Sequence, residues 1–262
     1  MFDLLRHNRE AWEKEGRTGN PWTIPVSSEE IALAKAGSPR LFLTPTKTIP
    51  AEWLAGMKDK KILCLASGGG QQGPLMAAFG SDVTVLDNCP AQLEKDSLVA
   101  RREGLTINLV TGDMRDLSRF PDASFEGIIH PVSNVFVDDV RPVWKEAFRV
   151  LKPGGELLSG FCNPLLYIFD LDKWDADKIL EVRYKIPYSD LGQLPNDVLA
   201  KRIEEHEAME FGHSLADQIG GQTDAGFHIV GFYEDLSGGN DLLDPYIATF
   251  IATRARKPAC RH

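Results

Sequence analysis

The residues best suited to chemistry in this 262-residue chain are three consecutive glycines, Gly68, Gly69 and Gly70. They interrupt an apolar run at 61–66, and a helical stretch follows from residue 74. Glycine lets the backbone approach a ligand closely and adopt positive φ, and the first turn of a helix offers unpaired amide N–H groups. A strand, tight turn and helix of this kind suits a carboxylate, a ribose or a phosphate.

A carboxylate, Asp87, ends the next apolar run at 83–86, about 20 residues after the glycine turn. At that spacing the acid of a nucleotide-binding βαβ unit holds ribose hydroxyls. Enzymes that use NAD and methyltransferases share this feature, so later segments have to separate the two classes.

The alternation of apolar runs and helical stretches predicts the elements that position these residues. Strands are expected near 61–66, 82–86, 107–110, 125–130 and 155–162, with helices in the intervals, including 92–103 and 140–151. Right-handed crossovers turn this order into a parallel sheet with helices on both faces. Ligands then bind at the carboxyl ends of the strands, where the loops at 66–72, 87–88, 112–114 and 130–134 converge.

Three later segments narrow the class: Val-Thr-Gly-Asp-Met at 110–114, a run at 120–129, and a stretch at 146–158 that contains Lys-Pro-Gly-Gly. In this order and spacing they resemble the class I S-adenosylmethionine-dependent methyltransferases, specifically the group with ubiquinone and menaquinone biosynthesis methyltransferases. The resemblance spans about residues 60–160 and resumes more weakly near 213–257. It implies an α/β fold with a doubly wound, mostly parallel, seven-stranded Rossmann-like sheet and an antiparallel last strand at 246–252.

The resemblance also implies S-adenosylmethionine as cofactor, with S-adenosylhomocysteine as product. The loop at 66–70 would cradle the methionine and ribose, Asp87 would hold the ribose hydroxyls, and Asn88 would lie against adenine. Asp113 would accept from the adenine amino group while Met114 packs on the ring. The expected cofactor-binding residues are Ala66, Ser67, Gly68, Gly69, Gly70, Gln71, Gln72, Asp87, Asn88, Gln92, Gly112, Asp113, Met114, His130, Pro131 and Val132. A helix cap remains the alternative for Asp87 and a turn residue for Asp113.

The first motif departs from the family pattern, which usually reads Asp-Leu-Gly-Cys-Gly-Thr-Gly where this chain has Cys-Leu-Ala-Ser-Gly-Gly-Gly at 64–70. The acid that opens the first motif is replaced by Cys64, so its usual role near the amino-acid end of the cofactor passes to other groups. Gln71 and Gln72 are the polar side chains expected to supply those contacts.

The candidate catalytic residues are His130 and Asn134, which follow the fourth expected strand, where methyl donor and acceptor should meet. An imidazole titrates near neutrality, so His130 is a candidate general base for a hydroxyl acceptor. The alternative is a hydrogen-bonded orienting group. Carbon, sulfur and amine acceptors need no base, and the sequence leaves the acceptor atom open.

We expect an N-terminal helical lid at 1–58, a methyltransferase domain at 59–257 with an acceptor-binding lid inserted at about 163–212, and a tail at 258–262. Trp12 and Trp22 are candidates for a wall of the cofactor pocket, or for packing on the core. The aromatic content of the insertion favours an apolar or ring-containing small molecule as acceptor, although ordinary core under a lid has the same composition. Residues 182–186 alternate like a strand.

Composition limits the remaining function classes. The net charge of −9 disfavours a nucleic-acid partner, because phosphate contacts need a basic surface. The basic cluster at 254–257 is expected to be a solvated tail. We expect no membrane span, no metal site and a cytoplasmic location, with Cys64, Cys89, Cys162 and Cys260 reduced.

The predicted function is transfer of a methyl group to a small-molecule acceptor by in-line displacement. One alternative is a non-catalytic domain that binds S-adenosylmethionine and regulates or scaffolds. The other is an NAD-dependent oxidoreductase, because residues 68–73 satisfy Gly-x-Gly-x-x-Gly. Three adjacent glycines make that match weak.

Overall fold

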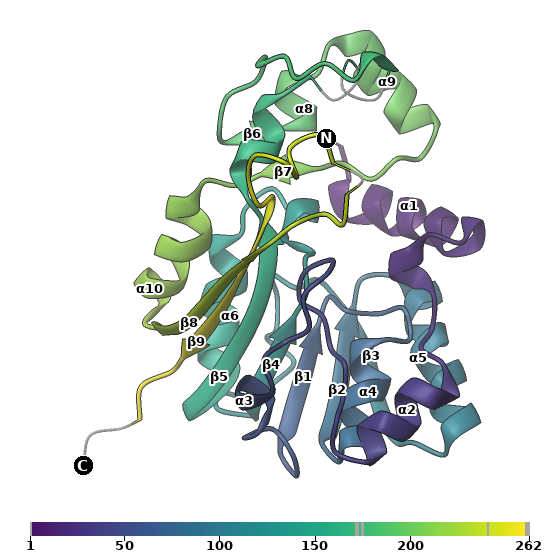
Figure 1. The fold of residues 1–262 in the computed structure, drawn as a ribbon, viewed down its shortest axis with the longest axis vertical. Helices are drawn as coiled ribbons and strands as arrows, with labels where there is room; N and C mark the ends of the chain where they lie inside the picture. The colour runs from purple at the N-terminus through teal and green to yellow at the C-terminus, as the bar shows by residue number, and fades with distance from the viewer. Residues whose placement is uncertain (1, 171–172, 174–175, 240, 260–262) are drawn as a thin grey trace.

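The computed structural model describes residues 2–170, 173, 176–239 and 241–259. Within them a central sheet carries helices on both faces (Figure 1). The strands of this sheet are β1 (Lys61–Leu65), β2 (Asp82–Asp87), β3 (Ile107–Thr111), β4 (Phe125–His130), β5 (Leu151–Cys162), β8 (His228–Asp235) and β9 (Phe250–Arg256). The helices are α1 (Leu4–Thr18), α2 (Ser28–Lys35), α3 (Ala51–Leu54), α4 (Gln72–Phe79), α5 (Pro90–Glu103), α6 (Arg141–Val150), α8 (Asp190–Gln193), α9 (Asn196–Glu204) and α10 (Gly221–Ala225).

The strands are ordered β3-β2-β1-β4-β5-β9-β8. β9 is antiparallel to both of its neighbours, and the other adjacent pairs are parallel. The predicted mostly parallel, seven-stranded sheet is therefore confirmed. Strand order reverses between β1 and β4, which is the point where ligands bind in sheets of this kind.

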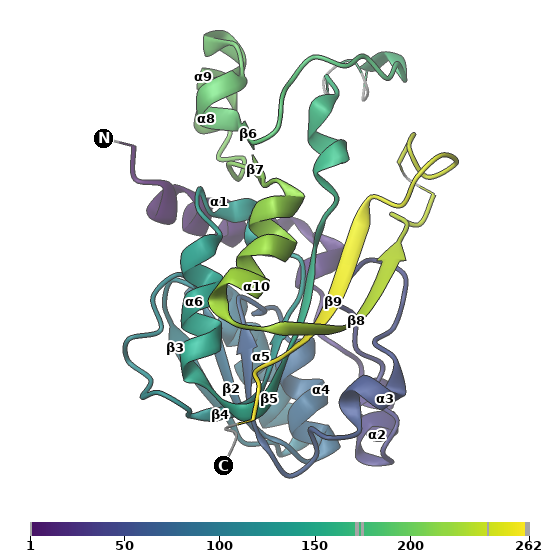
Figure 2. The same ribbon diagram turned by 90° about the vertical axis from the view of Figure 1, so that its left-hand side faces the viewer.

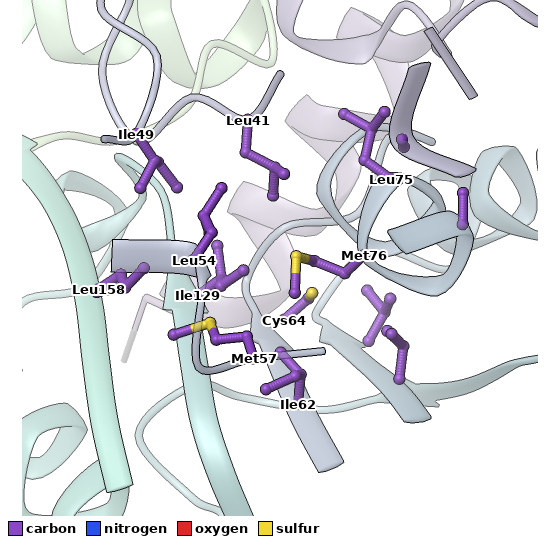
Figure 3. Close-up of a cluster of buried hydrophobic side chains, with 14 of the residues drawn as sticks. Leu41, Ile49, Leu54, Met57, Ile62, Cys64, Leu75, Met76, Ile129 and Leu158 are labelled. Carbon is purple, nitrogen blue, oxygen red and sulfur yellow. The ribbon is translucent and has the colours of Figure 1, made fainter. Parts of the chain in front are cut away.

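Alternate residues of β1 supply the two halves of the core, because successive side chains of a strand point to opposite faces. Ile62 and Cys64 pack under α2, α3 and α4, in the cluster shown in Figure 3. Leu63 and Leu65 pack on the other face, against Trp144 and its neighbours on α6. Figure 2 shows α6 and α10 together on this second face.

The sequence predicts the early strands closely, but it misplaces the end of the chain. The last strand is β9 at Phe250–Arg256, four residues later than expected. Arg254 and Arg256 belong to it, and both guanidinium groups bind the carboxylate of Glu156. The prediction of a solvated basic tail is wrong for these residues, because they pair across the sheet.

Two sets of hydrogen bonds organise the N-terminal segment. α2 begins with a capping box, in which Ser27 and Glu30 each accept a hydrogen bond from the other's backbone amide. Asp235, buried at the end of β8, accepts hydrogen bonds from Thr44 Oγ1 at 2.8 Å and from the amides of Thr46 and Lys47 at 2.8 and 2.9 Å. These bonds fix the loop that enters the core through residues 41–49.

A second layer lies beyond the carboxyl ends of the parallel strands (Figure 1). It contains α1, α8, α9 and a two-stranded antiparallel sheet of β6 (Tyr188–Ser189) and β7 (Phe211–Gly212).

The prediction of a strand at 182–186 is wrong, since that stretch contributes only an isolated bridge between Val182 and Phe169. Trp174 and Cys260 lie outside the described residues. None of the helices in the described ranges has the length and apolar character to span a bilayer.

Candidate active site

A cavity of about 720 Å³ opens over the carboxyl ends of the parallel strands. Its lining residues come from the ends of successive strands of the sheet. Ala66, Gly112 and Pro131 directly follow β1, β3 and β4, and Asp87 and Cys162 are the last residues of β2 and β5. Leu5, Asn8 and Trp12 of α1 and the exposed Trp22 complete the wall. The volume is within the usual range for small-molecule sites, about 300–1,000 Å³.

Asp87 faces the glycine turn. Its Oδ2 accepts from the amide of Gly68 at 2.8 Å, and its Oδ1 accepts from the amide of Cys89 at 2.9 Å. Burial raises the pKa of this carboxyl, and the backbone hydrogen bonds oppose the rise. A Cβ at Gly68 would lie only 3.0 Å from Asp87 Cγ and 2.9 Å from Gln92 Cβ, so the turn is closed to any larger residue.

The other two glycines turn away from the cavity. Gly69 has φ of 127° and Gly70 has φ of 79°, and a Cβ on either would meet the segment 22–25 at about 3.0 Å. Asp96, fully buried on α5, accepts from the amide of Gly69 at 3.1 Å. Burial raises the pKa of Asp96 to about 8 against the hydrogen bonds from these glycine amides. Among the described lining residues, Ala66, Ser67 and Gly68 are therefore the ones that the turn contributes.

Amide side chains around the cavity hold the N-terminal segment. Gln71 Nε2 donates to the carbonyl of Ile24 at 2.9 Å, and Gln72 Nε2 donates to that of Phe42 at 3.3 Å. Gln92 Nε2 donates to the carbonyl of Trp12 at 2.9 Å. The same three side chains line the cavity, so they join the segment to the expected cofactor loops.

Asn88 also contacts α1. Its Nδ2 donates to the carbonyl of Leu5 at 2.8 Å, and its Oδ1 accepts from Arg9 at 3.1 Å. Asp113 lines the cavity, but its carboxylate accepts hydrogen bonds from both Nε and Nη2 of Arg115, the second at 2.7 Å. A partner two residues along the chain was not anticipated from the sequence. The carboxylate keeps further lone pairs for a ligand.

His130 and Asn134 do not line the cavity, and both are fully buried. His130 Nδ1 lies 2.9 Å from the carbonyl of Leu65, and Nε2 lies 2.7 Å from Asn134 Oδ1. Asn134 in turn donates to Gln218 Oε1 at 3.0 Å. Burial lowers the pKa of His130. This geometry argues against a general base that reaches a substrate and fits an orienting group.

Cys64 packs in the core cluster of Figure 3 and does not reach the cavity. Cys64, Cys89 and Cys162 are free thiols. In the described part of the chain, no group of three or more His, Cys, Asp or Glu side chains is placed to hold a metal ion.

Comparison with known proteins identifies the class. The family described as "Methyltransferase domain" matches residues 63–159. An uncharacterized methyltransferase of Bacillus subtilis, YbaJ, is 53% identical over 257 residues, which cover 98% of this chain and 100% of that protein. The chain belongs to the class I S-adenosylmethionine-dependent methyltransferases.

Two further comparisons are more distant. An S-adenosylmethionine-dependent methyltransferase from Mesorhizobium loti matches this methyltransferase in fold with a TM-score of 0.58. The match has 18% identity and covers 76% of this chain and 92% of that one. A sterol 24-C-methyltransferase of Gibberella zeae is 28% identical over 195 residues, which cover 73% of this chain and 45% of that protein.

Residues of this methyltransferase fit the cofactor that the family implies. The close approach at Gly68 leaves backbone beside Asp87, as a ribose requires. Asp113 and Met114, which the resemblance assigns to adenine, line the same cavity.

The far end of the cavity holds residues that the sequence did not single out. Tyr167 follows β5, Glu210 precedes β7, and the two side chains are joined by a hydrogen bond of 2.9 Å. They are 43 residues apart in the chain, and no local motif connects them. Only the predicted insertion gave a signal, through its aromatic content.

Proposed function

We propose that this methyltransferase moves a methyl group to a small apolar or ring-containing acceptor bound in the same cavity as the cofactor. The observation that carries the proposal is the way the cavity lining changes in character from one strand end to the next. Groups suited to the cofactor stand at the ends of β1, β2 and β3, and apolar and aromatic side chains stand at the ends of β4 and β5. The two ligands would meet beyond β4.

We assign the cofactor end as the family resemblance suggests. Asp87 binds the ribose hydroxyls, and the backbone at 66–68 takes the methionine portion. Asp113 and Met114 take adenine. The positions of all these groups in one cavity support the assignment.

S-adenosylmethionine supplies a methyl group on a leaving group that is already activated, so the protein has to align the reactants and exclude water. Alignment at attack distance is worth about 7–11 kcal/mol. Pro131 and Val132 line the cavity where the ligands would meet, and His130 holds their loop through the carbonyl of Leu65. Trp12 covers the site, and its ring packs edge-on against that of Phe136 with 5.1 Å between the ring centroids.

The acceptor class has support from a relative. The sterol methyltransferase of Gibberella zeae is named for an apolar, ring-containing acceptor. The apolar side chains near the end of β5, among them Leu166 and Phe250, suit a molecule of that character.

Calorimetric titration tests the cofactor assignment. We expect S-adenosylmethionine and S-adenosylhomocysteine to bind and NAD not to bind. Asp87→Asn removes a charge-assisted hydrogen bond, worth about 1.5–3 kcal/mol, and should weaken S-adenosylhomocysteine by about tenfold or more. Asp82→Asn, at the opposite end of β2, is the matched control and should bind normally.

Failure to bind either sulfur compound would overturn the cofactor assignment. Equal affinities for wild type and Asp87→Asn would remove Asp87 from the ribose site.

A further inference from the structure

The end of the cavity proposed for the methyl acceptor contains a carboxylate, Glu210, that has no role in the function proposed above. Glu210 lines the cavity, and its Oε2 accepts the hydrogen bond from the Tyr167 hydroxyl. Within the described residues Glu210 forms no ion pair, because nearby Arg202 approaches Asp190 and Glu207 at 3.6 Å instead. An unpaired carboxylate in an apolar cavity is costly unless a ligand satisfies it.

The backbone of Glu210 is held on both sides. Its amide donates to Asp190 Oδ2 at 2.8 Å, and its carbonyl accepts from the amide of Asp190 at 3.1 Å. Asp190 is itself buried and accepts the hydroxyl of Tyr188 at 2.7 Å. The carboxylate is therefore positioned before any ligand arrives.

Tyr167 is held equally firmly. Its ring stacks on that of Tyr188 with 5.5 Å between centroids. A Cβ at Gly212 would lie 2.7 Å from Tyr167 Cβ, so β7 packs directly against the tyrosine. Such support fixes the Tyr167 hydroxyl on one oxygen of Glu210 and leaves the other oxygen, Oε1, for a ligand.

On the cavity side, the side chains beside this pair are apolar. Val132, Phe136, Cys162 and Leu166 line the same end of the cavity. A substrate bound there would pack its carbon atoms against these side chains on most sides. The Glu210 carboxylate would be the group that accepts a hydrogen bond from it.

On the basis of the proposed function, we infer that Glu210, oriented by Tyr167, binds the hydroxyl group of an otherwise apolar acceptor. The acceptor class is a ring-containing alcohol or phenol whose hydroxyl donates to Glu210. Glu210 is a specificity-determining residue in this assignment, and the hydroxyl it binds need not be the methylated atom.

The ionisation of Glu210 makes this interaction depend on pH. Burial, and then the charge of Asp190, raise the pKa of Glu210 to about 7, against the hydrogen bond from Tyr167 and the charge of Arg202. The titratable and charged groups that face Glu210 are Tyr167, Cys162, Asp190, Arg202 and Glu207. Burial raises the pKa of Cys162 to about 12 and that of Tyr167 well above its usual value, so both stay protonated between pH 6 and 8.

The test uses the full chain saturated with S-adenosylhomocysteine and two matched probes, 2-naphthol and 2-methoxynaphthalene. Affinities are measured by ligand-observed NMR at pH 6 and pH 8. The ionised carboxylate accepts the naphthol hydroxyl, so 2-naphthol should bind wild type about tenfold more tightly at pH 8, as a pKa near 7 requires. The methoxy probe should show no such change.

Glu210→Gln should weaken 2-naphthol about tenfold at pH 8 and remove its pH dependence. Glu207→Gln is the matched control, because Glu207 lies near but does not line the cavity. Tyr167→Phe should cause a smaller loss. Normal binding of S-adenosylhomocysteine shows that each variant is folded.

Three results would overturn the inference: equal behaviour of the two probes on wild type, equal effects of the two glutamine variants, or no binding of either probe while S-adenosylhomocysteine binds. Tighter naphthol binding at pH 6 would also contradict it, because Glu210 would then act as a donor. Loss of S-adenosylhomocysteine binding by wild type would instead overturn the proposed function.

Discussion

At the scale of single residues, the glycine turn shows how one atom can decide a binding site. Gly68 is needed because its missing Cβ leaves the space between Asp87 and Gln92. Ala66, where the family has glycine, keeps the left-handed conformation at φ of 47° and is held by its amide on the carbonyl of Leu86 at 2.7 Å. The turn therefore tolerates a methyl group at position 66, and close contacts oppose one at position 68.

Gly68→Ala is expected to weaken S-adenosylhomocysteine about tenfold or more. The new Cβ, 2.9–3.0 Å from its neighbours, has to push Asp87 or Gln92 from its place. Gly56→Ala is the control, since nothing lies within 4 Å of its Cβ. Calorimetry on both variants is the measurement, and an unchanged affinity for Gly68→Ala would contradict the tight packing.

At the scale of elements, α1 connects the two ends of the cavity. Arg9 binds Asn88 on the cofactor side. Asn8, one residue earlier, donates to the carbonyls of Phe136 and Met209 at 3.0 and 3.1 Å and accepts from the amide of Met209 at 2.8 Å. A single helix thus holds both the cofactor loops and the segment that carries Glu210.

Asn8→Ala should loosen the segment at 205–212. It leaves buried groups of Met209 without partners, at a cost of about 1–3 kcal/mol. Hydrogen exchange of that segment should become about tenfold faster or more, because local opening becomes easier. Asn108→Ala, at an exposed position on β3, should leave the exchange there unchanged, and equal protection in all three proteins would contradict the role of Asn8.

The elements differ in how far the sequence predicts them. β1, β2 and β4 follow from buried apolar runs, because those strands lie inside the sheet with helices on both faces. β3 lies at the edge of the sheet and is only partly buried, and its short apolar run still marks it. β6 and β7 have two residues each and pair across the insertion, so no periodicity can mark them. Of the site, Asp87 and the glycine turn follow from spacing along one βαβ unit. Glu210 and Tyr167 meet only through tertiary packing.

At the scale of the whole molecule, buried carboxyls shape the dependence of stability on pH. Burial raises the pKa of Asp96 to about 8, whereas an aspartate in the unfolded chain titrates near 4. Between about pH 4 and pH 8, Asp96 is therefore protonated in the folded state and ionised in the unfolded state. The stabilisation from neutral Asp96 is therefore full below about pH 4 and is lost as pH rises through about 8.

Asp96→Asn should remove this loss, because the amide stays neutral at every pH and its oxygen can still accept from Gly69. Relative to wild type, the variant should gain about 2–4 kcal/mol in free energy of unfolding between pH 5 and pH 8. Urea unfolding at the two pH values is the measurement. Parallel pH profiles for the two proteins would show that Asp96 is ionised in the fold.

The anchor at Asp235 has a consequence for how the chain is made. Thr44 and its carboxylate partner are 191 residues apart in sequence. A ribosome delivers the N-terminal residues first, so the loop at 44–47 waits for its partner until most of the chain has been synthesised. Contacts of such long separation form late and slowly. The loop at 44–47 can thus settle on the sheet only after β8 has been synthesised.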